Sequence, residues 1–147
     1  MIILRNLYKF DVPVAELIQI YILYIRSVVE QSAVLWHNSI TAGEQNDIER
    51  VQKVALKIIL KDNYVGYEEA LKETCLESLH DRRRKLCQGF ARKCVKSEKM
   101  AHMFPLNENS ANTRRPEKYH VTSATTDRLA NSAIPYMQRL LNQSKRK

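Results

Sequence analysis

Five basic residues recur at helical spacing in one segment of the chain: Arg82, Lys85, Arg92, Lys93 and Lys96. Because an α-helix completes a turn about every 3.6 residues, these positions fall on one side of a helix that spans 79–97. Guanidinium and ammonium groups in such a row can pair with the phosphates of a nucleic-acid backbone, which requires charge but no base-specific contact. We therefore predict a nucleic-acid-binding surface here; a solvated helix surface is the alternative interpretation.

The residue patterns that catalysis requires do not occur in the sequence. There is no P-loop, no G-x-G-x-x-G and no Tyr-x-Asp-Asp motif, whereas polymerases need convergent aspartates to hold two metal ions. The four histidines stand singly, and Cys75, Cys87 and Cys94 form no C-x-x-C pair. We expect no catalytic residue, no metal site, no cofactor and no enzyme activity. Cys87 and Cys94 lie seven residues apart and are predicted to be buried, reduced and apolar in role.

The net charge of +8 is distributed unevenly along the chain. Residues 1–80 carry 8 Lys+Arg against 11 Asp+Glu, whereas residues 81–147 carry 16 against 5. This asymmetry favours a polyanionic partner for the C-terminal half. Charged residues interrupt every apolar run, so we expect no signal peptide, no membrane partner and a nuclear or cytoplasmic location. The basic end SKRK (residues 144–147) is a weak match to a localisation signal.

The low content of Gly (3) and Pro (4) favours an all-α fold. We predict a small bundle of three to four helices with an irregular basic C-terminal extension and a short terminal helix. The predicted divisions are a helical domain over 1–104, a polar linker over 105–131, and a terminal helix with its basic tail over 132–147.

The first predicted helix begins near Asp11 and runs to about Leu35. Its apolar face at 3.6-residue spacing comprises Leu17, Ile20, Tyr21, Tyr24 and Val28. Tyr24 and Trp36 are predicted to be core residues, with base stacking as the alternative. Ile18, Ile22 and Ile25 widen the apolar surface, from which we expect exposed apolar area and self-association.

Capping-box spacings mark the next helix starts. Thr41 and Glu44 open a helix to about residue 61, followed by a short helix over 67–74, and Ser78 with Asp81 opens the helix over 79–97. The buried positions predicted for the two long helices are Ile48, Val51, Ala55 and Ile58, and Leu79, Leu86, Phe90 and Cys94. Arg83 falls among the apolar positions of its helix. It is therefore predicted to stabilise the fold, paired with one of the acidic residues Glu68, Glu69, Glu73 and Glu77.

The C-terminal segment contains one further helical pattern. Residues 105–131 show no helical period, and Tyr119 with Val121 is predicted to dock as a strand or as an anchor. Residues 132–142 then form a short helix with Pro135 in its first turn and Met137, Leu140 and Leu141 as its apolar residues.

Several blocks resemble, in order, the region that follows the catalytic domain in reverse transcriptases of non-LTR (LINE, jockey-like) retrotransposons. They are YILYIRSVVEQSAVLWHNSIT (21–41), DIERVQKVALKIIL (47–60), YEEAL (67–71), LESLHDRRRKLCQGFARKC (76–94), HMFP (102–105) and SAIPYMQRLLN (132–142). The resemblance implies a helical thumb, which in that family grips the template–primer duplex.

The sequence departs from the family by lacking the endonuclease, fingers and palm, including every catalytic aspartate. The function that the resemblance implies for this chain is therefore non-catalytic: weak binding to a nucleic-acid backbone without sequence preference. The alternative from another class is a helical protein-interaction or structural bundle, including a transposon remnant without a selected function. A DNA-binding regulator is a weaker third candidate, because no glycine-bearing helix-turn-helix junction occurs.

Overall fold

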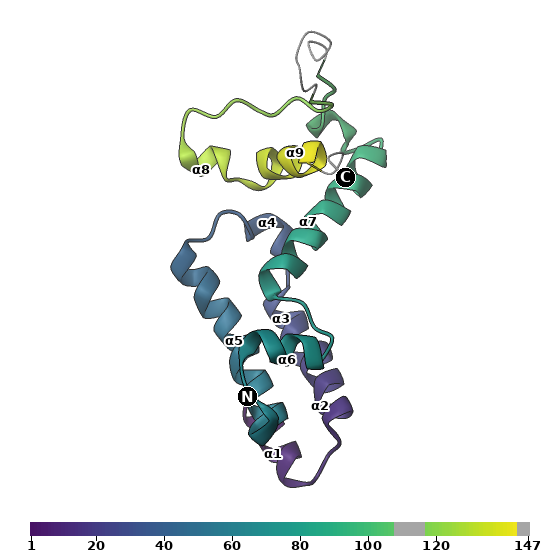
Figure 1. Ribbon diagram of the computed structural model, residues 1–147. Coiled ribbons are helices and arrows are strands. Elements are labelled where there is room, and N and C mark those ends of the chain that lie inside the picture. Colours follow the sequence, from purple (N-terminus) through teal and green to yellow (C-terminus); the bar gives the residue numbers. More distant parts are fainter. Residues whose placement is uncertain (108–116, 144–147) are drawn as a thin grey trace. The chain divides into compact units, whose positions relative to one another are not determined.

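The computed structural model describes residues 1–107 and 117–143, and in these ranges the chain is all-α, as predicted (Figure 1). The only β pairing among the described residues is an isolated antiparallel bridge between Leu106 and Tyr119. The chain divides into two compact units. The first comprises Met1–Gln31 and Thr41–Arg82, and the second comprises Ser32–Ile40 and Arg83–Lys147. Each unit thus combines two separate segments, whereas the predicted divisions 1–104, 105–131 and 132–147 run linearly along the chain.

The first unit is organised around the long helix α5. Its helices are α1 (Ile2–Lys9), α2 (Val14–Ile20), the π-helical segment η1 (Tyr21–Arg26), α3 (Ser27–Val29), α5 (Ala42–Leu60), the 3-10 segment η2 (Lys61–Asn63) and α6 (Tyr67–Glu73). α1, which has no counterpart among the predicted helices, packs with α2 and α5. Leu4, Leu17, Tyr21, Ala55 and Ile59 form the buried cluster that joins these three helices. Burial of this apolar surface holds the unit together.

The start of α5 follows the predicted capping box. The backbone N–H of Glu44 donates to Thr41 Oγ1 at 3.3 Å, and the Thr41 N–H donates back to Glu44 Oε2 at 2.7 Å. These bonds satisfy donors that a helix N-terminus otherwise leaves without partners. The same contacts hold the pKa of the exposed Glu44 carboxyl below its usual range.

The buried side of α5 differs from the prediction. Ala55 is buried as expected, but Ile48, Val51 and Ile58 are only half-buried. The fully buried positions are Gln52, Ala55, Leu56, Ile59 and Leu60. The buried face of α5 is therefore shifted by about one residue from the face that its apolar residues predict, because a polar side chain, Gln52, occupies the interior.

The single long helix predicted from Asp11 to Leu35 is wrong. Helical backbone continues through α2, η1 and α3 to Val29, and a turn then separates it from α4 (Ala33–Trp36). Ser32 adopts a left-handed conformation (φ 53°), which a continuing α-helix does not allow. Periodicity alone did not reveal this break, because the residues on both sides are apolar.

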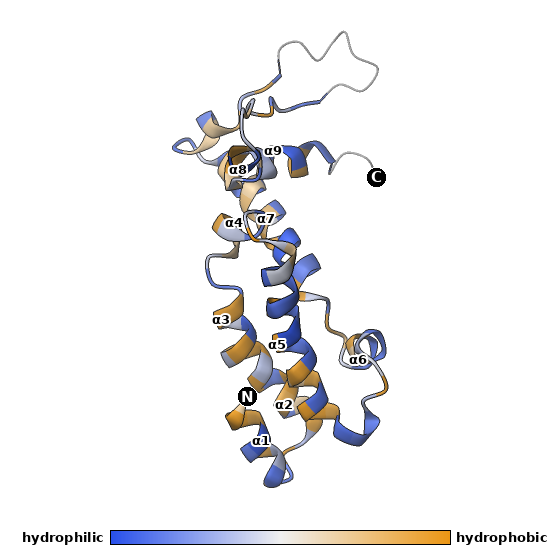
Figure 2. Cartoon of the chain, turned by 90° about the vertical axis from the view of Figure 1, so that its left-hand side faces the viewer, coloured by the Kyte–Doolittle hydropathy of each residue, from blue (hydrophilic) through white to orange (hydrophobic). Residues whose placement is uncertain are grey.

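The apolar face predicted for this region is correct only in part. Leu17 and Tyr21 are buried, but Tyr24 and Val28 are 68% and 67% exposed, so neither is a core residue. Ile18, Ile22 and Ile25, predicted to be exposed, are half-buried against the first unit's core instead. The π-helical turn of η1 changes the register of side chains along the helix, so a 3.6-residue pattern fails there. Figure 2 shows the hydrophobic character of α2 and α3.

A chain of polar side chains crosses the interior of the first unit. The Tyr21 hydroxyl donates to Gln52 Oε1 at 2.7 Å, and Gln52 Nε2 donates to the Tyr67 hydroxyl at 3.1 Å and to the Glu77 carbonyl at 2.8 Å. The Tyr67 hydroxyl in turn donates to Glu49 Oε1. This network explains how Gln52 is buried without the cost of losing its hydrogen bonds.

The second unit packs the C-terminal helix against α7 (Leu79–Lys96), which contributes to this unit from Arg83 onward. Its other helices are α4, the 3-10 segment η3 (Ala101–Met103), α8 (Asp127–Ala130) and α9 (Ala133–Gln143). Ala91, Cys94, Phe104, Tyr119, Met137 and Leu141 form its buried cluster. The predicted terminal helix is confirmed as α9, with Pro135 in its first turn and Met137, Leu140 and Leu141 buried.

Tyr119 anchors the described part of the predicted linker. Its ring is buried, its backbone N–H donates to Asn142 Oδ1 at 3.0 Å, and Asn142 Nδ2 donates to its carbonyl at 2.9 Å. The linker is also not wholly irregular, because Thr126 caps the short helix α8 through the N–H of Leu129. Residues 108–116 and the basic tail 144–147 lie outside the described residues.

Candidate nucleic-acid interface

Helix α7, which carries the predicted basic face, is fixed at its N-terminus by side-chain caps. Ser78 Oγ accepts from the Asp81 N–H at 3.1 Å, which confirms the predicted helix start. The Glu49 carboxylate of α5 accepts from the N–H groups of Leu79 and His80 at 3.0 and 3.3 Å. A carboxylate at this end also interacts favourably with the helix dipole. The sequence analysis missed Glu49, because its position on α5 gives no sign of a partner 30 residues away.

Four members of the basic face are exposed side chains of the second unit: Lys85, Arg92, Lys93 and Lys96. Residues 85, 92 and 96 follow at intervals of seven and four, and residue 93 lies one position beside them. The helix therefore presents these four cations on one side, as the sequence predicted.

Arg82 differs from the other four. It belongs to the first unit, where its Nε donates to Glu30 Oε1 at 3.0 Å and its side chain is 39% exposed. Arg26 lies 3.8 Å from the same Glu30 oxygen, four residues earlier on the chain. Glu30 therefore neutralises part of the Arg82 charge, which reduces what this side chain can contribute to a phosphate contact.

The opposite side of α7 forms the interior. Leu79 and Cys94 are buried as predicted, whereas Leu86 and Phe90 are only half-buried. Their neighbours Cys87 and Ala91 occupy the core instead. Small side chains at 87 and 91 allow other elements of the second unit to approach the helix closely, which the apolar pattern did not distinguish.

Arg83 is fully buried, as its position among the apolar residues predicted. Within the second unit, its Nε donates to His37 Nδ1 at 3.4 Å, and its guanidinium lies 5.4 Å from the centroid of the Trp36 ring. An arginine can bury its planar group against an aromatic ring in this way. Trp36, predicted to be a core residue, is only half-buried, although its ring contacts the buried Arg83. The carboxylate partner expected for Arg83 remains a prediction.

Gly89 also lies on the basic face of α7, although the sequence did not indicate a role for it. It follows Lys85 by four residues and precedes Arg92 by three, so it lies between them on the basic face. A Cβ atom placed at Gly89 would meet no atom within 4 Å. Packing therefore does not require glycine at this position, although glycine costs about 1 kcal/mol in a helix interior.

The described residues contain no group of three or more His, Cys, Asp or Glu side chains that could hold a metal ion. Cys87 and Cys94 are buried and Cys75 is exposed. Burial raises the pKa of the Cys87 thiol to about 11. Cys87 thus behaves as a neutral core residue, in agreement with the prediction.

Comparisons with known proteins give no match to a family model, to a curated protein or to a solved structure. Among the described residues, no helix has both the length and the apolar character to cross a membrane.

Proposed function

We propose that this protein binds the phosphate backbone of duplex nucleic acid through the basic face of α7, without catalysing a reaction. The observation that carries the proposal is the exposure of Lys85, Arg92, Lys93 and Lys96 on one side of α7. The resemblance to the thumb of a non-LTR retrotransposon reverse transcriptase supports the same role, since that thumb holds a template–primer duplex.

The physical basis of such binding is the release of counterions from the nucleic acid. Each protein cation that neutralises a phosphate releases counterions from the nucleic acid. Their release favours association, and it favours association less as the salt concentration rises. Four contacts from one helix give weak binding, with a dissociation constant of about 10⁻⁴–10⁻⁶ M at physiological salt and little dependence on sequence. Net charge supports this assignment, because the second unit carries 15 Lys+Arg against 4 Asp+Glu over its full sequence.

The test is a salt titration with the triple variant Arg92→Ala, Lys93→Ala and Lys96→Ala. Duplex DNA and an RNA–DNA hybrid are titrated against both proteins at several salt concentrations. The variant should bind every sequence more weakly. The slope of the logarithm of its affinity against the logarithm of the salt concentration should be shallower by up to about three. Unchanged affinity and slope would show that this face is only solvated.

A matched control removes the same charge elsewhere in the second unit. Lys99, Lys118 and Arg128 are exposed and lie outside α7. Replacing these three with Ala should reduce affinity much less than the α7 variant does. An equal loss in the two variants would assign binding to overall charge and not to the basic face.

A second candidate function, protein interaction, is favoured by a different surface. Leu23, Tyr24 and Val28 are 65%, 68% and 67% exposed and lie within η1 and α3 of the first unit. Neighbouring exposed apolar side chains of this kind are common in protein–protein contacts. Concentration-dependent sedimentation that disappears in a Leu23→Ser, Val28→Ser variant would support this function as self-association.

A further inference from the structure

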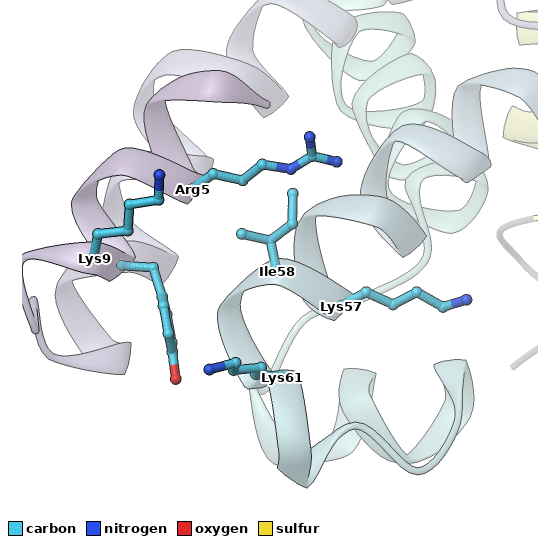
Figure 3. A pocket seen from close by; sticks show the side chains of 6 residues that line it. Arg5, Lys9, Lys57, Ile58 and Lys61 are labelled. Carbon is cyan, nitrogen blue, oxygen red and sulfur yellow. The ribbon is translucent and has the colours of Figure 1, made fainter.

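A pocket of about 350 Å³ in the first unit is lined by side chains of α1, α5 and η2 (Figure 3). Its lining residues are Arg5, Tyr8, Lys9, Lys57, Ile58 and Lys61. Four of the six are cations and none is acidic. The volume lies at the lower end of the range of about 300–1,000 Å³ that is typical of small-molecule sites.

The concentration of positive charge in this pocket contrasts with the rest of the N-terminal half. Residues 1–80 contain only 8 Lys+Arg against 11 Asp+Glu, yet half of these cations line one pocket. Among the described residues, none of the four forms a salt bridge. Figure 3 shows the Arg5 guanidinium and the Lys61 ammonium at opposite ends of the pocket. The Lys57 ammonium lies 5.4 Å from the centroid of the Tyr64 ring, outside the pocket. An anion in the pocket would therefore pair with Arg5 or Lys61, not with all four cations.

Apolar groups lie between the charged ends of the side chains that line the pocket. Figure 3 shows Arg5 extending from α1 across Ile58, while Lys57 points away from α1. The Lys61 ammonium lies 4.9 Å from the centroid of the Tyr8 ring. Ile58 and the Tyr8 ring thus supply apolar contact beside the cations, which a phosphate alone would not need.

The backbone at Lys61 adds a second indication. Its φ of 46° lies in the left-handed region, where glycine is the least strained residue. A lysine at this position places a cation directly after α5, beside the pocket, at a cost in backbone strain. Strained non-glycine residues cluster at ligand sites more than elsewhere.

We propose that this pocket binds a nucleotide, with its phosphate at the Arg5 guanidinium and its base against Ile58 and Tyr8, where Lys61 adds positive charge. The same chemistry is offered by a free mononucleotide and by the 5′-phosphorylated end of a single strand. The site is separate from the basic face of α7 and does not depend on it. Aromatic and basic side chains together are the combination that accepts both a base and its phosphate.

The test is calorimetric titration of the full chain at low salt with AMP, with inorganic phosphate and with a 5′-phosphorylated trinucleotide. AMP should bind at least about tenfold more tightly than inorganic phosphate, because only AMP uses the apolar contact. Tighter binding of the trinucleotide than of AMP would assign the site to a strand end, and equal binding would assign it to a mononucleotide. Absence of AMP binding, or binding of hexaglutamate as tight as that of AMP, would overturn the proposal.

Two charge-reversed variants locate the site. Arg5→Glu with Lys61→Glu should weaken AMP binding by at least about tenfold. Lys53→Glu with Lys72→Glu changes two exposed lysines of the same unit outside the pocket, and should leave AMP binding nearly unchanged. The α7 triple variant should also bind AMP normally. Equal losses of AMP affinity in the pocket and control variants, at similar melting temperatures, would contradict a defined site. If charge reversal unfolds the protein, the variant Arg5→Gln with Lys61→Gln repeats the test.

Discussion

At the scale of single residues, Gly89 and Arg83 show how differently two positions on one helix can be used. Arg83 lies in the interior against Trp36 and His37, whereas Gly89 lies on the basic face with open space in front of it. The first position should matter for stability and the second for binding. Substitutions at the two sites therefore separate structural effects from functional ones.

Replacing Gly89 with leucine should raise stability and lower affinity. Leucine has a higher helix propensity, worth about 0.5–1 kcal/mol, and its side chain meets no neighbour. The same side chain would keep a phosphate backbone away from Lys85 and Arg92. Thermal melting and duplex titration of the variant measure the two effects. Gly43→Leu, in the first turn of α5, is the control that should not affect binding, and an unchanged affinity of Gly89→Leu would remove the argument for close approach.

Arg83→Ala should lower stability by about 2–5 kcal/mol, because it leaves a cavity beside Trp36 and removes a buried cation–aromatic contact. Arg83→Met fills more of the space and should cost less. Chemical denaturation measures both losses. Below the melting temperature, duplex affinity should remain near that of the unsubstituted protein. A melting temperature unaffected by Arg83→Ala would be the contrary result.

At the scale of secondary-structure elements, the start of α7 depends on a residue of α5. Glu49 accepts two backbone N–H groups of α7 and the hydroxyl of Tyr67, so one carboxylate joins α5, α6 and α7 within the first unit. Helix α7 carries the candidate interface. The first turn of α7 therefore depends on a side chain that lies 30 residues earlier in the sequence.

Glu49→Ala should destabilise the protein by about 2–3 kcal/mol, because it leaves two helix-terminal donors and the half-buried Tyr67 hydroxyl without their acceptor. Asp47→Ala removes an exposed carboxylate two residues earlier on α5 and should change stability little. Denaturant unfolding of both variants measures the difference. If the two variants lose the same stability, the cap on α7 is not energetically important.

At the scale of the whole molecule, the fold buries several acidic groups in their neutral form. Burial raises the pKa of Cys87 to about 11. Burial also raises the pKa of Tyr21 and Tyr67, and in Tyr67 the hydrogen bond to Glu49 adds to the effect. In the unfolded chain these groups ionise at lower pH than in the folded protein. Alkaline pH therefore favours unfolding.

The melting temperature should fall as the pH rises through about 9 to 11. The contribution of Cys87 is fully present below pH 9.0, the ordinary value of a thiol, and is lost as the pH rises through the folded-state pKa of about 11. Calorimetric scans at a series of pH values measure the effect. Cys87→Ala should have a shallower decline than the unsubstituted protein. A flat profile up to pH 11 would show that these groups are not buried in their neutral form.

Local interactions could be predicted from the sequence by itself. The all-α class, the capping box at Thr41, the extent of α7, the short helix α9 and the cation spacing on α7 depend on residues within one or two helical turns. Such contacts repeat with the helical period, so the order of residues specifies them.

Contacts between distant residues were decided only by the tertiary structure. The buried side of α5 differs from the apolar pattern because Gln52 forms hydrogen bonds with Tyr21 and Tyr67. The buried side of α7 differs from it because the small residues at 87 and 91 allow close packing. The pocket likewise brings together Arg5 and Lys61, which are far apart along the chain. A polar residue becomes a good core residue only when a distant partner satisfies it, and helical periodicity carries no information about that partner.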